Sequence, residues 1–411
     1  MLNKLSAAMA KIARNRYLMA VRDGVVATLP LIMVGSFFLI IAFPPIPEEW
    51  GIHQWIIANR GDILLPFRVT MSLMTLYAII GIGGSLAKHY ELDTTSASII
   101  AVMGYLFTLV PVITEYGWAL PMANMGSQGL FIGAIVAIFS VETLRFCKSR
   151  NLMFKMPDGV PPSVARSFEA IIPTAIVVVA VSIFTFWLKI DLHGLIMTVM
   201  TPIISGSDSI FAVIALVLLI TLFWAFGIHG MAIAGTLARP IWLVLQEQNT
   251  AAMAAGQLPP NIAPEAFYQW FIWIGGAGAT IGLAILLAFR SKSVVGKTLG
   301  RTSIVPAIFN INEPIIFGAP IVLNPILIPP FIIAPIANGI IAYIALSLGL
   351  VGRVVTIAPW TLPGPIGAFI ATGGDWRAIV LSLFLIALSV VIYYPFFKKY
   401  DEMAISDEAK A

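Results

Sequence analysis

Asn310, Asn312 and Glu313, followed directly by Pro314, lie in the apolar stretch Phe309–Pro330, which reads FNINEPIIFGAPIVLNPILIPP. A charge at the centre of a membrane helix costs about 2.5–3.5 kcal/mol by insertion scales, so a carboxylate in such a stretch is a functional candidate. A carboxylate accepts hydrogen bonds and an amide both donates and accepts them, which is the pairing that sugar hydroxyls need. We therefore predict that Glu313 and Asn312 contact a ligand. The alternative is a carboxylate buried against an arginine or kept protonated for structural reasons.

His229 is the second candidate, in the segment WAFGIHG of Trp224–Gly230. An imidazole can act as a general base or bond to a hydroxyl, and the glycines on both sides of His229 allow close backbone approach. The alternative is a histidine that bonds a carbonyl at a helix end. Trp224 could stack on a sugar ring or could be an ordinary interfacial tryptophan.

Two further residues are candidates for ligand contact, and Asn124 is the weaker of them. Trp360 lies among prolines in APWTLPGP, where an aromatic platform and an interfacial anchor are both open interpretations. Asn124 lies in PMANMGSQGLF, where a loop asparagine is often a helix cap.

The elements that must position these residues are membrane helices. Hydrophobic residues make up 59% of the 411 and charged residues 11%, far from the ~25% charged residues of soluble domains. We expect about ten transmembrane spans, each of roughly 20 apolar residues. Clusters of Lys and Arg before the first span and after the fourth, eighth and tenth are separated by even numbers of spans. This parity predicts an all-α polytopic protein with both termini in the cytoplasm.

Two apolar stretches do not fit this count, near residues 301–325 and 353–375. Both are rich in Pro and Gly, and irregular backbone at membrane depth survives only when it is buried in protein or lines a cavity. We interpret both as re-entrant hairpins. The eighth span is expected over Phe267–Phe289, with the glycines of GGAGATIG, like those of GIGGS at Gly81–Ser85, serving close helix packing.

Other chemistry is not indicated. The four histidines show no metal-ligand spacing, the glycine runs lack the strand and the Gly-Lys-Ser/Thr of nucleotide loops, and the single cysteine, Cys147, excludes an internal disulfide. We expect no metal and no cofactor. The modest charge of +4 lies mainly in loops, which argues against nucleic acid as a partner.

The segments FNINEPIIFGAPIVLNP, GIHG, GLFIGAIVAIFSVE and KMPDGVPPSVARSF together resemble enzyme IIC, the membrane component of the bacterial phosphoenolpyruvate:sugar phosphotransferase system. The branch that they resemble is the lactose/cellobiose/diacetylchitobiose group. This resemblance implies a homodimer of ten-span protomers in the inner membrane. Residues 1–190 would form a scaffold and dimerisation half, and residues 191–411 would enclose a disaccharide.

The resemblance also assigns roles. Glu313 matches a glutamate expected to hold the hydroxyl that is phosphorylated, and His229 a histidine near the same hydroxyl; Asn312, Trp224, Trp360 and Asn124 match sugar-contacting positions. The implied partners are a cytoplasmic phosphocysteine component (IIB) and a phosphohistidine component (IIA). With no IIB-like segment and only Cys147, the chain is not expected to phosphorylate a sugar alone. An ion-coupled transporter with Glu313 as its coupling site stays the competing hypothesis, and a channel-like protein without saturable sugar binding is a third.

Overall fold

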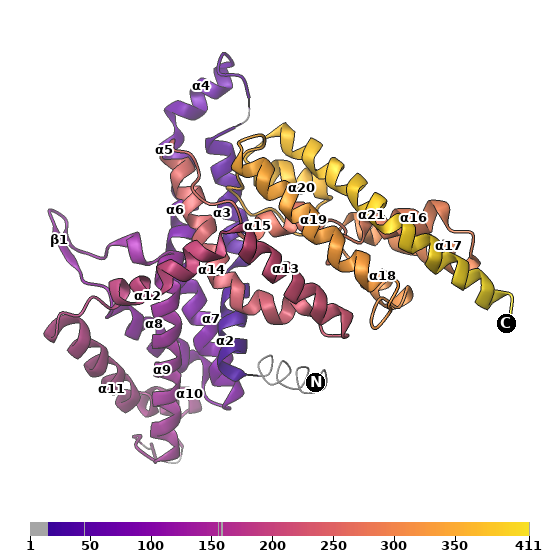
Figure 1. Ribbon diagram of the computed structural model, residues 1–411. Coiled ribbons are helices and arrows are strands. Elements are labelled where there is room, and N and C mark those ends of the chain that lie inside the picture. Colours follow the sequence, from indigo (N-terminus) through magenta and orange to yellow (C-terminus); the bar gives the residue numbers. More distant parts are fainter. Residues whose placement is uncertain (1–14, 45, 155, 158, 411) are drawn as a thin grey trace. The chain divides into compact units, whose positions relative to one another are not determined.

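The computed structural model describes residues 15–44, 46–154, 156–157 and 159–410, and helices make up most of this chain (Figure 1). The chain forms two compact units. The first holds the described part of Met1–Gly35 together with Leu65–Ile203 and Thr236–Pro240. The second holds Ser36–Leu64, Ile204–Gly235 and Ile241–Ala411, up to residue 410 as described. The predicted division at residues 190 and 191 stays a prediction.

The core of the first unit is built by α2 (Arg16–Ala27), α7 (Met74–His89), α8 (Thr94–Leu106) and α9 (Leu130–Ser149). Helix α2 begins after Asn15, whose side chain accepts the backbone N–H groups of residues 17 and 18. Helices α2 and α7 approach closely at Gly24 and Gly81, where an added Cβ on Gly81 would lie 2.7 Å from the Cα of Gly24. The prediction that the GIGGS glycines serve helix packing is confirmed at Gly81.

The remaining elements of the first unit are short or peripheral. They include a two-stranded antiparallel hairpin, in which Val112 of β1 pairs with Ala119 of β2, a small departure from the all-α prediction. The bounds are α6 (Leu65–Thr70), η1 (Met71–Leu73), β1 (Val112–Thr114), β2 (Gly117–Ala119), η2 (Met122–Asn124), η3 (Ser127–Gly129), α10 (Pro162–Glu169), α11 (Ile171–Ser182) and η4 (Ile183–Trp187). Helices α3 (Leu29–Ala42) and α12 (Leu192–Ser207) each continue from the first unit into the second.

The second unit contains the long C-terminal helices. Helix α16 packs on α17 and α21, and an added Cβ on Gly300 would lie 2.2 Å from the backbone N of Ala288. The bounds are α4 (Gly51–Ala58), α5 (Arg60–Ile63), α13 (Ile210–Ala225), α14 (Gly230–Ala254, of which Thr236–Pro240 belong to the first unit), α15 (Glu265–Phe267), η5 (Tyr268–Ile272), α16 (Ile281–Arg290), α17 (Val294–Ile308), α18 (Glu313–Gly318), α19 (Ile328–Ser347), α20 (Gly364–Ala371) and α21 (Trp376–Glu408).

The end of α21 is fastened to the loop between α16 and α17 by two carboxylates. Asp401 is 6% exposed and accepts the Ser291 hydroxyl and the backbone N–H groups of Lys292 and Ser293. Glu408 accepts the Ser293 hydroxyl and two N–H groups of the first turn of α17, where the helix dipole also favours a negative charge. This clasp fixes the start of the helix that leads to Glu313.

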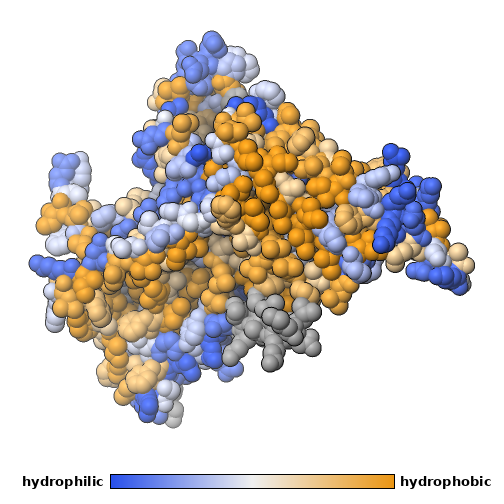
Figure 2. All heavy atoms as spheres, in the orientation of Figure 1, coloured by the Kyte–Doolittle hydropathy of each residue, from blue (hydrophilic) through white to orange (hydrophobic). Residues whose placement is uncertain are grey.

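Six helical segments of the described chain are long and apolar enough to cross a membrane, or seven when α12 and α13, which meet at 81°, count as one broken span. The chain is thus a mostly helical polytopic membrane protein; ten spans with both termini in the cytoplasm stay a prediction. On the face shown in Figure 2, apolar side chains cover the C-terminal helices around α19 and α21, and hydrophilic ones gather where α16 and α21 end and α17 begins. The six segments are Arg16–Ala42, Arg60–His89, Ser127–Ser149, Val164–Trp187, Ile328–Ser347 and Trp376–Glu408.

The prediction of one helix over Phe267–Phe289 is wrong. The chain forms α15 and a π-helical turn, η5, and becomes helical again only at Ile281. Between them Gly275, Gly276 and Gly278 have φ values of 78°, 91° and 83°, which L side chains rarely adopt. These glycines break the helix rather than serve the packing of a continuous one. We call Trp273–Thr280 the glycine turn.

Candidate functional site

The first predicted hairpin folds back at Asn310. Helix α17 ends with the Ile311 N–H bonded to the Pro306 carbonyl and the Asn310 N–H to the Ala307 carbonyl, the pattern of a Schellman motif. Asn310 has φ 61°, the left-handed position of that motif, which glycine usually occupies. The reversal lets α18 begin at Glu313 and pack against α17. Pro314 fits the first turn of α18 because its missing N–H would have no partner there.

Glu313 is exposed at the start of α18. Among residues 15–410 as described, no donor and no cation lies within bonding distance of its carboxylate. The alternative of a carboxylate buried against an arginine is therefore wrong. An exposed acid in a strongly apolar segment is available to a ligand.

Asn312 is 4% exposed and directs its amide into the glycine turn, where Nδ2 donates to the Ala277 carbonyl at 2.7 Å. Its neighbour there is Gly276: a Cβ on Gly276 would lie 2.4 Å from the Asn312 Cγ. The glycine turn thus packs directly against the Asn312 side chain at the start of α18, and position 276 has no room for a side chain. Asn312 in this way fixes the backbone that presents Glu313.

Trp360 lies in the second predicted hairpin. Residues 353–363 run back along α20, and the N–H groups of Val355 and Thr356 donate to the Ala371 carbonyl. The Trp360 side chain is 51% exposed, while its backbone carbonyl accepts a hydrogen bond from Asn310 Nδ2 at 2.9 Å. The indole is therefore accessible and its backbone is fixed to the segment that carries Glu313.

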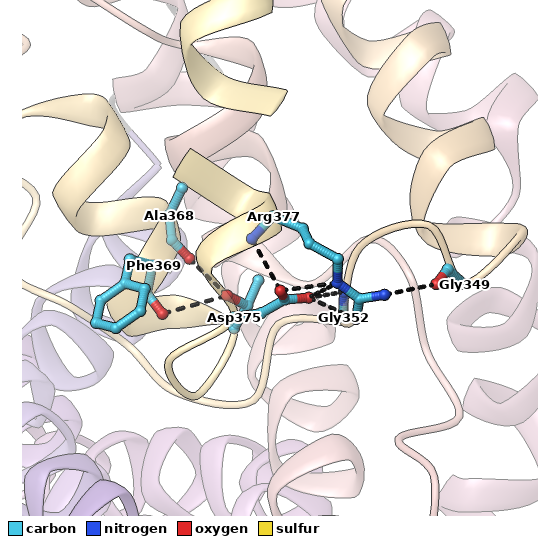
Figure 3. Close-up of polar contacts among 7 residues, drawn as sticks. Gly349, Gly352, Ala368, Phe369, Asp375 and Arg377 are labelled. Atoms are coloured by element: carbon cyan, nitrogen blue, oxygen red, sulfur yellow. Dashed lines mark hydrogen bonds and ion pairs between the residues drawn. The ribbon is translucent and has the colours of Figure 1, made fainter. Parts of the chain in front are cut away.

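The second hairpin is closed by Asp375 and Arg377, which point toward each other beside Gly352 (Figure 3). Asp375 caps α21, accepts the Gly352 N–H at 2.7 Å and pairs with the Arg377 guanidinium at 2.9 Å. Burial alone would raise the pKa of Asp375, but the hydrogen bonds from Arg377 and Gly352 outweigh it and hold the pKa below its usual value. The carboxylate stays ionised and keeps the two ends of the hairpin together.

His229 and Trp224 meet at the turn between α13 and α14. Helix α13 ends in a second Schellman motif, with Gly227 at φ 76°, and the two rings have centroids 4.4 Å apart. His229 is exposed, whereas Trp224 is 5% exposed and its Nε1 has no hydrogen-bond partner among the described residues. The Trp224 ring thus supports His229, and direct contact of Trp224 with a sugar stays a prediction.

The His229 turn is joined to the far end of the first hairpin, because the Leu323 N–H donates to the Ala225 carbonyl at 2.9 Å. Gly230 is required by close packing: a Cβ there would lie 2.2 Å from the Ile220 carbonyl oxygen. The turn therefore has little freedom to shift relative to α13.

Asn124 belongs to the first unit, at the end of η2. Its backbone carbonyl accepts the Tyr105 hydroxyl. The described residues include no group of three or more His, Cys, Asp or Glu side chains that could hold a metal ion. Cys147 is a buried, free thiol. Contact of Asn124 with a sugar stays a prediction.

Sequence reasoning missed Asn310 as a member of the site. Its amide links three segments: it accepts the Gly275 N–H at 3.0 Å and donates to the Trp360 and Leu362 carbonyls, both at 2.9 Å. The signal was present in FNINEP, where an asparagine follows the last apolar turn of a helix at the place typical of glycine.

An apolar polytopic chain with broken helices, an accessible carboxylate and an exposed aromatic ring has the features of a membrane transport protein. A family model for the phosphotransferase system EIIC component matches residues 22–335, so the chain belongs to that family, the sugar permease components of phosphotransferase systems.

Relatives and a solved structure match almost the whole chain. This chain is 39% identical to the lichenan permease IIC component of Bacillus subtilis (strain 168), over 97% of this chain and 92% of that protein. It is 38% identical to the cellobiose-specific EIIC component of Geobacillus stearothermophilus, over 97% and 93%. The crystal structure of the transporter ChbC, the IIC component of the N,N'-diacetylchitobiose-specific phosphotransferase system, shares 36% identity and covers 98% of both chains with a TM-score of 0.92.

Proposed function

We propose that this chain binds a β-linked disaccharide of the cellobiose or diacetylchitobiose type and translocates it while a separate IIB protein phosphorylates it. The observation that carries the proposal is the exposed Glu313 carboxylate, which has no partner in the described chain and lies three residues after Asn310, whose amide bonds the backbone of the exposed Trp360. Carboxylate and ring offer a sugar a hydrogen-bond acceptor and an apolar face. The names of the relatives support the class of sugar.

The chemistry that we propose is transfer of a phosphoryl group from the IIB phosphocysteine to the 6-hydroxyl of the sugar. The sugar oxygen forms the new P–O bond, the P–S bond breaks to leave a thiolate, and the hydroxyl proton passes to Glu313 or His229. Phosphoryl transfer depends mainly on positioning and charge stabilisation, and a base contributes about 10²–10⁴-fold. The Trp224 ring packs against the His229 ring and supports it.

The proposed assembly follows the family. The protomers form a homodimer in the bacterial inner membrane through residues 1–190, residues 191–411 carry the sugar, and Asn124 contributes from the N-terminal half. IIB, recharged by IIA, supplies the phosphoryl group from the cytoplasm. Residues near 301–325 and 353–375 act as re-entrant hairpins, which the fold-back at Asn310 and the pairing of residues 355 and 356 with Ala371 support.

The test is Glu313→Gln in the purified protein, with Glu402→Gln, an exposed glutamate near the end of α21, as the matched control. We expect Glu313→Gln to weaken binding of labelled cellobiose or diacetylchitobiose about 10- to 100-fold, the size of a hydrogen bond to a charged group. Phosphorylation by IIB should fall by about 10²-fold or more. Phosphorylation near the wild-type rate would show that the role of Glu313 is wrong.

The ion-coupled alternative draws on the same free carboxylate, which could bind a proton or sodium ion. Sealed vesicles that hold only this chain separate the two functions. Accumulation of unmodified sugar driven by a proton or sodium gradient would favour the transporter, whereas sugar phosphate that appears only with phosphorylated IIB favours group translocation.

A further inference from the structure

Three apolar segments meet at one buried side chain in the second unit. Asn310 is 8% exposed and uses both of its amide N–H groups and its carbonyl oxygen. The donors reach Trp360 and Leu362, and the oxygen receives the N–H of Gly275. An amide offers two donors and two acceptor sites, so three of its four possible hydrogen bonds are made.

The backbone at Asn310 does not itself require asparagine. Its place in the Schellman motif calls for a left-handed residue, and glycine adopts that conformation most readily. The equivalent place at the end of α13 is occupied by Gly227. The side chain therefore contributes what a glycine cannot, namely the bonds to the two other segments.

The carbonyls that Asn310 holds belong to the turn that presents Trp360. The Leu362 N–H donates to the Pro359 carbonyl at 3.1 Å, so residues 359–362 form one tight turn. The carbonyls of Trp360 and Leu362 in this turn both point at Asn310 Nδ2. Glu313 lies three residues after Asn310, and Asn312 between them is bonded to Ala277. The Asn310 amide therefore fixes the backbone that carries Trp360 to the backbone that leads to Glu313.

We propose that Asn310 is a positioning residue that places the Trp360 ring for the sugar. It touches no ligand itself and acts through the backbone of the 359–362 turn. The inference rests on the proposed function, in which Trp360 forms one side of the sugar site. The affinity for the sugar then depends partly on a buried amide that does not itself touch the sugar.

Asn310→Gly tests the proposal cleanly, because glycine keeps the left-handed backbone and deletes only the side chain. Asn151→Gly is the matched control: Asn151 ends α9 in the same motif with φ 52°, is exposed, and makes no side-chain hydrogen bond within the described chain. Asn310→Asp is the second variant. Its carboxylate still accepts the Gly275 N–H but cannot donate to the two carbonyls.

The readout is the dissociation constant of labelled cellobiose and diacetylchitobiose for the purified full chain. We expect Asn310→Gly and Asn310→Asp to raise it about tenfold, the size of a displaced aromatic contact, and Asn151→Gly to leave it unchanged. In a Trp360→Ala background, Asn310→Gly should change the constant less than about twofold, because residues that act through one contact are not additive. In a Glu313→Gln background the tenfold effect should persist.

Several results would overturn the positioning role. They are wild-type affinity in a folded Asn310 variant, an undiminished effect in the Trp360→Ala background, no effect of Trp360→Ala itself, or loss of folding in both Asn310 variants, which would make the amide purely structural. Failure of the proposed function looks different. In that case the wild-type chain binds neither disaccharide, or Glu313→Gln leaves both binding and phosphorylation intact.

Discussion

Gly276→Ala in the glycine turn should disturb the candidate site by displacing the side chain of Asn312. Gly276 has φ 91°, and an added Cβ would lie 2.4 Å from the Asn312 Cγ and 2.7 Å from its Nδ2. Neither atom can retreat while the Asn312 amide stays bonded to the Ala277 carbonyl at 2.7 Å. We expect the substitution to break that bond and to shift the backbone immediately before Glu313.

Two costs add up in Gly276→Ala. A non-glycine residue at positive φ costs about 1–2 kcal/mol. Displacing the Asn312 amide leaves the carbonyl of the buried Ala277 without a partner, which costs about 1–3 kcal/mol more. The free energy of unfolding should therefore fall by about 2–5 kcal/mol, and sugar affinity should fall with it because Asn312 and Glu313 move.

The assay compares Gly276→Ala with Gly256→Ala by denaturant titration in detergent and by sugar binding. Gly256 has φ 70° and would meet nothing within 4 Å, so its substitution isolates the backbone cost of about 1–2 kcal/mol. The excess in Gly276→Ala reports the steric and hydrogen-bond cost at Asn312. If both variants lose the same stability and both bind sugar as the wild type does, the packing argument for the glycine turn is refuted.

Three further results are expected. The pKa of Asp375 is depressed in the folded state, so the ionised carboxylate stabilises the fold above about pH 4 and this stabilisation is lost on acidification. Asp375→Asn should therefore lower the melting temperature at pH 7, and the melting temperature of the variant should fall less steeply than that of the wild type below pH 4. Asp401→Ala should cost about 2–4 kcal/mol of unfolding free energy, since it leaves several donors without an acceptor, whereas Glu402→Ala, on an exposed neighbour, should cost almost nothing. Gly230→Ala should slow sugar phosphorylation by displacing the His229 turn, while Gly206→Ala, with nothing within 4 Å, should not.

The sequence predicted those features that depend on the residue types within one short segment. Apolar length indicated the membrane class, and prolines and glycines located the two segments that fold back, because both residue types have local backbone consequences. Glu313 was recognised from its own segment too, because a single charge in an apolar run is costly and therefore a functional candidate.

The sequence was misleading where glycine has two uses. The glycines of GIGGS and GGAGATIG look alike, yet Gly81 packs inside α7 and Gly276 breaks a helix. What separates them is the partner: Gly81 meets the backbone of another helix, whereas Gly276 meets the Asn312 side chain from 36 positions further along. Such a pairing is set by tertiary structure, and no local pattern predicts it. The hydrogen-bond partners of Asn310 were missed for the same reason, although FNINEP holds the local signal for its left-handed backbone.

The contacts that join the three segments of the candidate site, here called the joints, involve no charged side chain. The glycine turn, residues 309–320 and residues 354–372 contain one ionisable side chain between them, Glu313. They are held together by amide and backbone hydrogen bonds at Asn310 and Asn312. A charged joint would interact strongly with the carboxylate in these weakly polar surroundings and would compete with a ligand for it. Neutral joints leave the charge of Glu313 available to a ligand, and they predict that Glu313→Gln lowers sugar binding and phosphorylation while the fold persists.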